Sequence, residues 1–172
     1  MPEQDLCSQN PSLKKGIPSA SIWLWLSLLV VGLDQLTKIW VSATLALYQS
    51  IPVLPFFDLR LLHNEGAAWS ILATAGGWQR WFLAGLAIFV TGILIVWLSR
   101  TQRQQYWLAS ALALVIGGAV GNVIDRLIYG YVIDFIDIYY QGWHWPAFNI
   151  ADSAICIGVV LLLIDALLGT ER

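Results

Sequence analysis

Charge is scarce in this chain. Aspartate, glutamate, lysine and arginine make up 12% of its 172 residues, whereas a typical soluble domain has about 25%. Such a composition could not cover a water-soluble surface, so it excludes an ordinary soluble domain. The formal net charge of -2 is also too small to favour nucleic acid as a partner.

Cysteine and histidine are scarce as well, with two of each. Cys7 lies in a polar N-terminal stretch and Cys156 inside an apolar run, so we expect no disulfide between them. No His/Cys cluster has metal-ligand spacing, and His63 and His144 belong to no catalytic motif. A Gly-x-Ser-x-Gly nucleophile elbow is also missing. We therefore expect no metal and no cofactor.

Long apolar runs dominate what is present. Hydrophobic residues reach 58%, with ten tryptophans, a residue that favours membrane–water interfaces. Crossing the bilayer core takes about 20 mostly apolar residues in a helix. The sequence predicts a mainly α membrane protein with four transmembrane helices over residues 21–41, 79–99, 105–125 and 147–168.

Basic residues near the span ends predict the orientation. With four spans, the N-terminal tail, the link between the second and third spans and the C-terminal tail lie on the same side of the membrane. That side is predicted to be cytoplasmic because it carries five basic residues: Lys14, Lys15, Arg100, Arg103 and Arg172. The polar tail 1–20, expected to be disordered, and the tail 169–172 lie on that side. Loops 42–78 and 126–146 face outward.

The first span has an alternative interpretation as a cleaved signal peptide. Val41-Ser42-Ala43 resembles a small-residue cleavage site. Against this, Asp34 and Lys38 lie within the segment, which a signal-peptide apolar region does not normally contain.

Both outer loops contain strand-like segments. Asp58 and Arg60 alternate with apolar residues over 57–62, and residues 132–138 are rich in β-branched and aromatic side chains. We expect the two loops to pair into a small sheet. Residues 67–75 are apolar and could lie along the membrane surface, and the loop 64–75 is a candidate lid.

Polar and ionisable residues inside membrane segments are costly and therefore functional candidates. Most of them fall at one predicted depth, near the outer helix ends: Asp34, Lys38, Asn122, Asp125, Arg126, Asp134, Asn149 and Asp152. Structural roles are alternatives: an Asp34–Lys38 ion pair at i,i+4, an Asp125–Arg126 pair, and Asn149 as a helix N-cap.

Asp134 and Asp152 are the strongest catalytic candidates because apolar residues flank both and neither has a basic neighbour in sequence. Two carboxylates in a water-poor site share a proton. Such a pair can activate water while the protonated partner polarises a carbonyl. A pair of Asp125 and Asp152 is the alternative; an ionised Asp125 beside Arg126 would be a poor acid.

Five segments, in order, resemble the lipoprotein signal peptidase (signal peptidase II) family. They are Asp34-Gln35-Leu36-Thr37-Lys38, Asn64-Glu65-Gly66-Ala67-Ala68-Trp69, Gly117-Gly118-Ala119-Val120-Gly121-Asn122-Val123-Ile124-Asp125-Arg126, Val132-Ile133-Asp134-Phe135 and Phe148-Asn149-Ile150-Ala151-Asp152-Ser153. Glu65 stands where the family often has Thr, and Trp69 where Phe is common.

The resemblance implies an aspartic endopeptidase of the bacterial inner membrane that cleaves prolipoproteins just before a diacylglyceryl-modified cysteine. It implies Asp134 and Asp152 as the catalytic pair, with a β-sheet cradle on the periplasmic side and membrane lipid as surroundings. The residues it implies as supporting or substrate-binding are Asp34, Lys38, Asn64, Gly118, Asn122, Asp125, Arg126 and Asn149.

Two other functions remain open at this point. A transporter or proton relay would need acids spanning the membrane, and only Asp165 lies near the other face. A non-catalytic assembly factor would use the outer cradle to bind peptide, and its binding would survive replacement of both aspartates.

Overall fold

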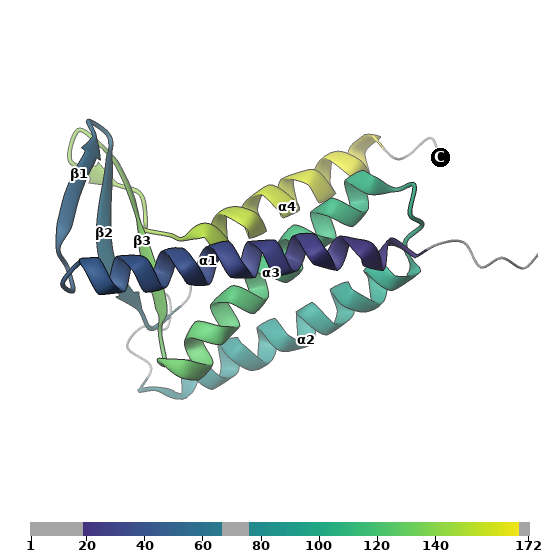
Figure 1. The fold of residues 1–172 in the computed structure, drawn as a ribbon, viewed down its shortest axis with the longest axis horizontal. Coiled ribbons are helices and arrows are strands. Elements are labelled where there is room, and N and C mark those ends of the chain that lie inside the picture. Colours follow the sequence, from purple (N-terminus) through teal and green to yellow (C-terminus); the bar gives the residue numbers. More distant parts are fainter. Residues whose placement is uncertain (1–18, 67–75, 169–172) are drawn as a thin grey trace, which may run out of the picture.

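The computed structural model describes residues 19–66 and 76–168 (Figure 1). The tails 1–18 and 169–172 and the segment 67–75 lie outside the described residues. Most of the tail predicted to be disordered, Cys7, Trp69 and most of the candidate lid 64–75 fall in those parts. The predicted disorder is wrong for residues 19 and 20, because Ser19 caps a short helix that begins at the fully buried Ala20.

Four long apolar helices form the body of the molecule, which confirms the predicted membrane fold. They are α1 (Leu24–Thr44), α2 (Trp78–Arg100), α3 (Tyr106–Ile128) and α4 (Ile150–Leu168), and a short 3-10 helix, η2 (Ala20–Trp23), precedes α1. Each is long and apolar enough to cross a membrane. The chain is a multi-pass membrane protein.

Helix α3 is the centre of the bundle and packs against the other three (Figure 1). Its glycines allow this packing. A Cβ at Gly117 would lie 2.8 Å from the Ser27 carbonyl oxygen of α1, and one at Gly118 would overlap the Ala151 carbonyl oxygen of α4. Close packing of helices through small residues is a common arrangement in membranes.

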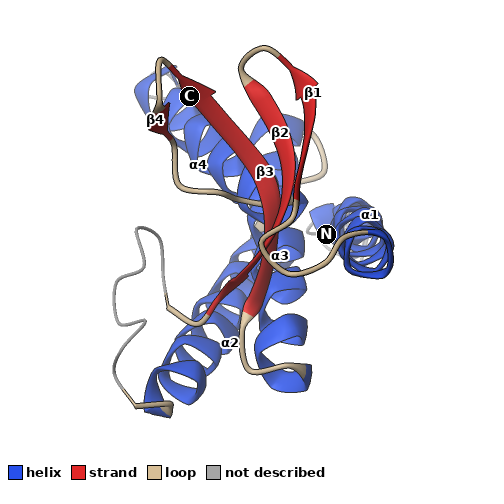
Figure 2. Ribbon diagram, turned by 90° about the vertical axis from the view of Figure 1, so that its left-hand side faces the viewer, coloured by secondary structure: helices blue, strands red, loops and turns tan. Residues whose placement is uncertain are grey.

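The two outer loops pair into one antiparallel sheet, as the sequence predicted. Its strands are β1 (Ser50–Leu54), β2 (Phe57–Asn64), β3 (Val132–Tyr140) and β4 (Trp143–His144), in that spatial order. The central pairing joins β2 of the first loop to β3 of the second. Figure 1 shows the strands at one end of the bundle, where α1 and α3 end, and Figure 2, which faces that end, shows them in front of the helices.

The opposite end of the bundle holds the beginning of α1 and the link between α2 and α3. There the Ala20 amide donates to the Thr101 carbonyl oxygen at 3.0 Å. Arg100 at the C-terminal end of α2 and Arg103 before α3 therefore lie at the end away from the sheet.

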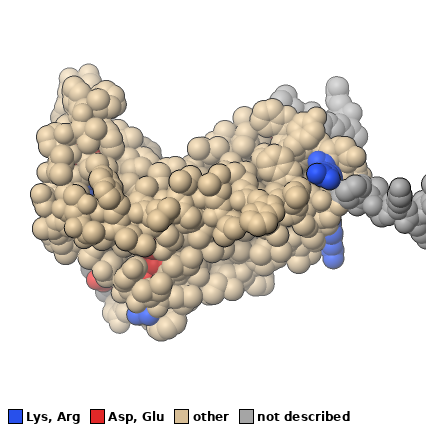
Figure 3. Space-filling view, in the orientation of Figure 1, with Lys and Arg blue, Asp and Glu red and all other residues tan. Residues whose placement is uncertain are grey.

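The surface of the helices is apolar. Large side chains such as Trp25, Leu36, Phe89 and Leu163 are each more than half exposed. Figure 3 shows most of one face without charge, with charged side chains gathered toward the two ends of the bundle. This surface suits lipid rather than water.

Helix α4 begins at Ile150, so the expected start at residue 147 is wrong. The Phe148 backbone is extended instead: its amide donates to the Ile136 carbonyl oxygen at 3.1 Å, and its own carbonyl oxygen accepts from Ile136 at 2.8 Å. These hydrogen bonds to β3 keep the backbone at Phe148 extended, so the helix begins only after it. Helices α1 and α3 each end three residues later than expected, at Thr44 and Ile128.

Candidate active site

A cavity of about 840 Å³ opens between the sheet and the start of α4. Asp134 of β3 and Asp152 of α4 both line it. Three more of the predicted residues share its wall: Asn64, Asn122 and Arg126. Elements that are distant in sequence therefore bring five of the predicted site residues to the wall of one cavity.

Asp134 is almost completely buried, with 3% of its surface exposed. Its two carboxylate oxygens accept hydrogen bonds from side-chain amides, from Asn64 at 3.0 Å and from Asn149 at 2.8 Å. Burial and, after it, the Asp152 charge raise the pKa of the Asp134 carboxyl to about 7, although the two amide bonds and the Lys38 charge oppose the rise. This carboxyl can therefore hold a proton near neutral pH.

Asp152 is fixed by the first turn of α4. Its backbone amide donates to the Asn149 side-chain oxygen at 2.9 Å, and its carboxylate accepts from the Asn149 backbone amide at 3.3 Å. This reciprocal pattern is a capping box, with Asn149 as the N-cap. Because the Asn149 side-chain amide also donates to Asp134, one residue holds both carboxylates.

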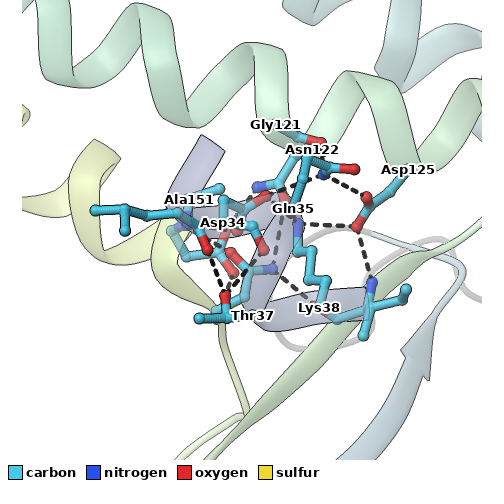
Figure 4. Close-up of polar contacts among 12 residues, drawn as sticks. Asp34, Gln35, Thr37, Lys38, Gly121, Asn122, Asp125 and Ala151 are labelled. Carbon is cyan, nitrogen blue, oxygen red and sulfur yellow. Dashed lines mark hydrogen bonds and ion pairs between the residues drawn. The ribbon is translucent and has the colours of Figure 1, made fainter. Parts of the chain in front are cut away.

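A buried ionic cluster lies behind the cavity (Figure 4). The Lys38 ammonium is 2.8 Å from a carboxylate oxygen of Asp34 and 2.8 Å from one of Asp125, and these three side chains are at most 1% exposed. Asp34 also accepts from the Ala151 backbone amide of α4 at 2.9 Å. The cluster thus ties α1, α3 and α4 together beside Asp152.

Asn122 connects this cluster to the cavity. Lys38 donates to its side-chain oxygen at 3.0 Å, so the amide group of Asn122 points the other way and donates to Asp152 at 2.7 Å. The ammonium of Lys38 therefore determines which end of the Asn122 side chain faces the carboxylate.

Asp125 and Arg126 do not form the structural pair that their adjacency suggested. Arg126 donates to the carbonyl oxygens of Gly66 at 3.0 Å and of Asn122 at 3.4 Å. Asp125 instead binds Lys38. Consecutive residues on a helix point in different directions, so adjacency alone does not make a pair.

The alternative pair of Asp125 and Asp152 finds no support in this geometry. The oxygens of Asp125 accept from Gln35 at 2.9 Å and from the Ile133 backbone amide at 3.1 Å, besides binding Lys38. Asp125 is 0% exposed and is not part of the cavity wall. Its carboxylate therefore does not face the cavity.

One predicted supporting residue, Gly118, acts through packing, and one polar residue near the site was not predicted. Gly118 contacts α4 at Ala151, one residue before Asp152, and does not line the cavity. The sequence reasoning missed Gln35, whose amide donates to Asp34, Asp125 and the Gly121 carbonyl oxygen. The sequence feature that could have identified Gln35 is its polar side chain within an apolar span, next to Asp34.

In the described ranges 19–66 and 76–168, no three His, Cys, Asp or Glu side chains are grouped so that they could hold a metal ion. The polar groups that contact Asp134 and Asp152 are side-chain and backbone amides, which suits hydrogen bonding and proton transfer by the two carboxyl groups.

Known proteins resemble this chain over most of its length. A family model described as Signal peptidase (SPase) II matches residues 26–168. A lipoprotein signal peptidase of Pseudoalteromonas atlantica is 55% identical over 143 residues, which cover 83% of this chain and 87% of that protein. One of Ralstonia nicotianae is 53% identical over 150 residues, covering 87% and 86%.

The fold has solved relatives too. A bacterial membrane enzyme with 35% sequence identity matches with a TM-score of 0.78, covering 87% of this chain and 90% of its own. A second such structure gives a TM-score of 0.75, again at 35% identity, covering 88% and 94%. From the extent of the family match and the identity to its members, the chain belongs to the signal peptidase II family.

Proposed function

We propose that this chain is an aspartic endopeptidase that removes the signal peptide from prolipoproteins, cleaving just before a diacylglyceryl-modified cysteine. The observation that carries the proposal is the pair Asp134 and Asp152 on one cavity wall, both held by Asn149. The names of the relatives support the substrate class. Membership of a peptidase family favours this function over a transporter or an assembly factor.

The pair holds one proton between its two carboxyl groups, since two adjacent negative charges in a buried site repel each other. The ionised carboxylate takes a proton from a water molecule, whose oxygen attacks the scissile carbonyl carbon. The protonated carboxyl donates to the carbonyl oxygen as charge develops there. The C–N bond then breaks as the carboxyl that took the proton from water gives it to the amine nitrogen of the released cysteine. The other carboxylate regains a proton from the hydroxyl group of the intermediate as the new carboxyl group of the signal peptide forms, which restores the shared proton.

The location of the cavity suits a lipid-modified substrate. Asp152 lies in the first turn of α4 and Asp134 on the adjoining strand, at the end of the bundle that carries the sheet. Acyl chains on the cysteine stay in one leaflet, so the bond to be cut lies near that membrane surface. We place this end at the periplasmic face of a bacterial inner membrane, with both chain termini in the cytoplasm.

Replacing either aspartate tests the proposal. We expect Asp134→Asn and Asp152→Asn each to abolish cleavage of a diacylated precursor, measured by mass spectrometry with the purified protein in detergent. Asp165→Asn, at the far end of α4, is the matched control and should cleave normally. Wild-type protein should leave a precursor without the lipid uncut. Cleavage by either of the first two variants would remove that residue from the pair.

A further inference from the structure

Glu65 adds a third carboxylate to the wall of the cavity. It follows Asn64, the residue whose amide binds Asp134, and its own side chain is exposed on that wall. The charges nearby determine whether this carboxylate is neutralised within the protein or is left to act on a bound substrate.

The one arginine of the cavity does not neutralise Glu65. Arg126 is held by two backbone carbonyl oxygens, those of Gly66 and Asn122. The carboxylates whose charges act on its guanidinium are Asp152, Asp134 and Asp125. Its positive charge is therefore balanced by the catalytic pair and the cluster behind it.

The one histidine of the cavity is a weak partner as well. Burial lowers the pKa of His63, and the Glu65 charge only partly opposes that shift, so this imidazole is largely neutral at neutral pH. Its ring stacks on Tyr131 with the centroids 3.8 Å apart. No ion pair within 4.0 Å involves Glu65 among the described residues, and the segment 67–75 contains no Lys, Arg or His.

We infer that Glu65 selects precursors by the charge of the residue directly after the modified cysteine, favouring a basic residue and disfavouring an acidic one. This inference rests on the proposed function. On the proposed function, the apolar signal peptide would bind among the helices, and the mature chain would leave toward the sheet. Glu65, just past the end of β2, lies on that second side.

The experiment measures kcat/KM for three diacylated precursors that differ only in having Lys, Gln or Glu after the cysteine. For the wild type we expect the Lys precursor to be preferred over the Glu precursor by about fivefold, the size expected of one partly solvated charge pair. The Lys/Glu ratio should fall close to one in Glu65→Gln, persist in Glu65→Asp, and invert in Glu65→Lys. Added salt should reduce it in the wild type.

Asp165→Asn is the matched control, because it removes one negative charge from the same chain at the other end of the bundle; its ratio should equal that of the wild type. A wild-type ratio near one, or a Glu65→Gln ratio equal to that of the wild type, would overturn the inference while leaving the proposed function intact. If the wild type cut none of the three precursors, both the inference and the proposed function would be overturned.

Discussion

Asp125 and Asp134 are both buried aspartates, on the consecutive elements α3 and β3, yet their surroundings differ in kind. Asp125 binds the Lys38 ammonium and accepts from Gln35 and a backbone amide. Among residues 19–66 and 76–168, the hydrogen-bond donors to the Asp134 carboxylate are the neutral amides of Asn64 and Asn149, and the charge of a second carboxylate, Asp152, acts on it. The Asp125 carboxylate joins helices through its ion pair, whereas Asp134 lines a cavity with a second carboxylate and has a raised pKa, so it can take part in proton transfer.

The largest expected effect on stability comes from removing the Lys38 ammonium, the cation that binds Asp125. Lys38→Met leaves Asp34 and Asp125 buried without their shared partner, so we expect the free energy of unfolding to fall by about 3–5 kcal/mol. Reversible unfolding in detergent micelles measures it.

Arg60→Met is the control for that change. Arg60 is 38% exposed and lies 3.6 Å from Asp137, so its loss should cost less than about 1 kcal/mol. Equal losses for the two variants would contradict the view that Lys38 holds the buried cluster.

A smaller effect is expected at the contact that brings Asp152 to α3. A side chain at Gly118 would overlap the Ala151 carbonyl oxygen, so Gly118→Val should force α3 and α4 apart and cost about 1–3 kcal/mol. Gly92→Val on α2 is the matched control, because nothing lies within 4 Å of a Cβ there. Comparable unfolding temperatures for both variants would refute a packing role for Gly118.

The helices and the sheet were predictable because long uncharged runs and strand alternation are local patterns. The ionic partners were not. The sequence offered Arg126 as the neighbour of Asp125, but the partner is Lys38 on a different helix. The start of α4 was misplaced for a similar reason, since Phe148 is apolar in sequence yet extended by its bonds to Ile136. Both outcomes depend on contacts between distant segments.

A further effect is a pH dependence on the catalytic side. The pKa of the Asp134 carboxyl is 3.8 in the unfolded chain and about 7 in the folded protein. The folded state therefore binds this proton more tightly than the unfolded state. The stability that this carboxyl contributes is present in full below pH 3.8 and is lost as the pH rises through 7.

We therefore expect the unfolding temperature of wild type relative to Asp134→Asn to decrease from acidic to neutral pH. The cleavage rate of the wild type should also decline above about pH 7, as the pair loses its shared proton. A flat difference in unfolding temperature over this range would argue that Asp134 ionises as freely as in the unfolded chain.

The most direct test of the difference between the two aspartates is to make the same substitution at each. Cleavage of a diacylated precursor and unfolding temperature are measured for Asp125→Asn and Asp134→Asn. We predict that Asp134→Asn folds stably and cleaves nothing, whereas Asp125→Asn is less stable but still cleaves detectably. Cleavage by Asp134→Asn, with none by a folded Asp125→Asn, would contradict the assignment of catalysis to the pair Asp134 and Asp152.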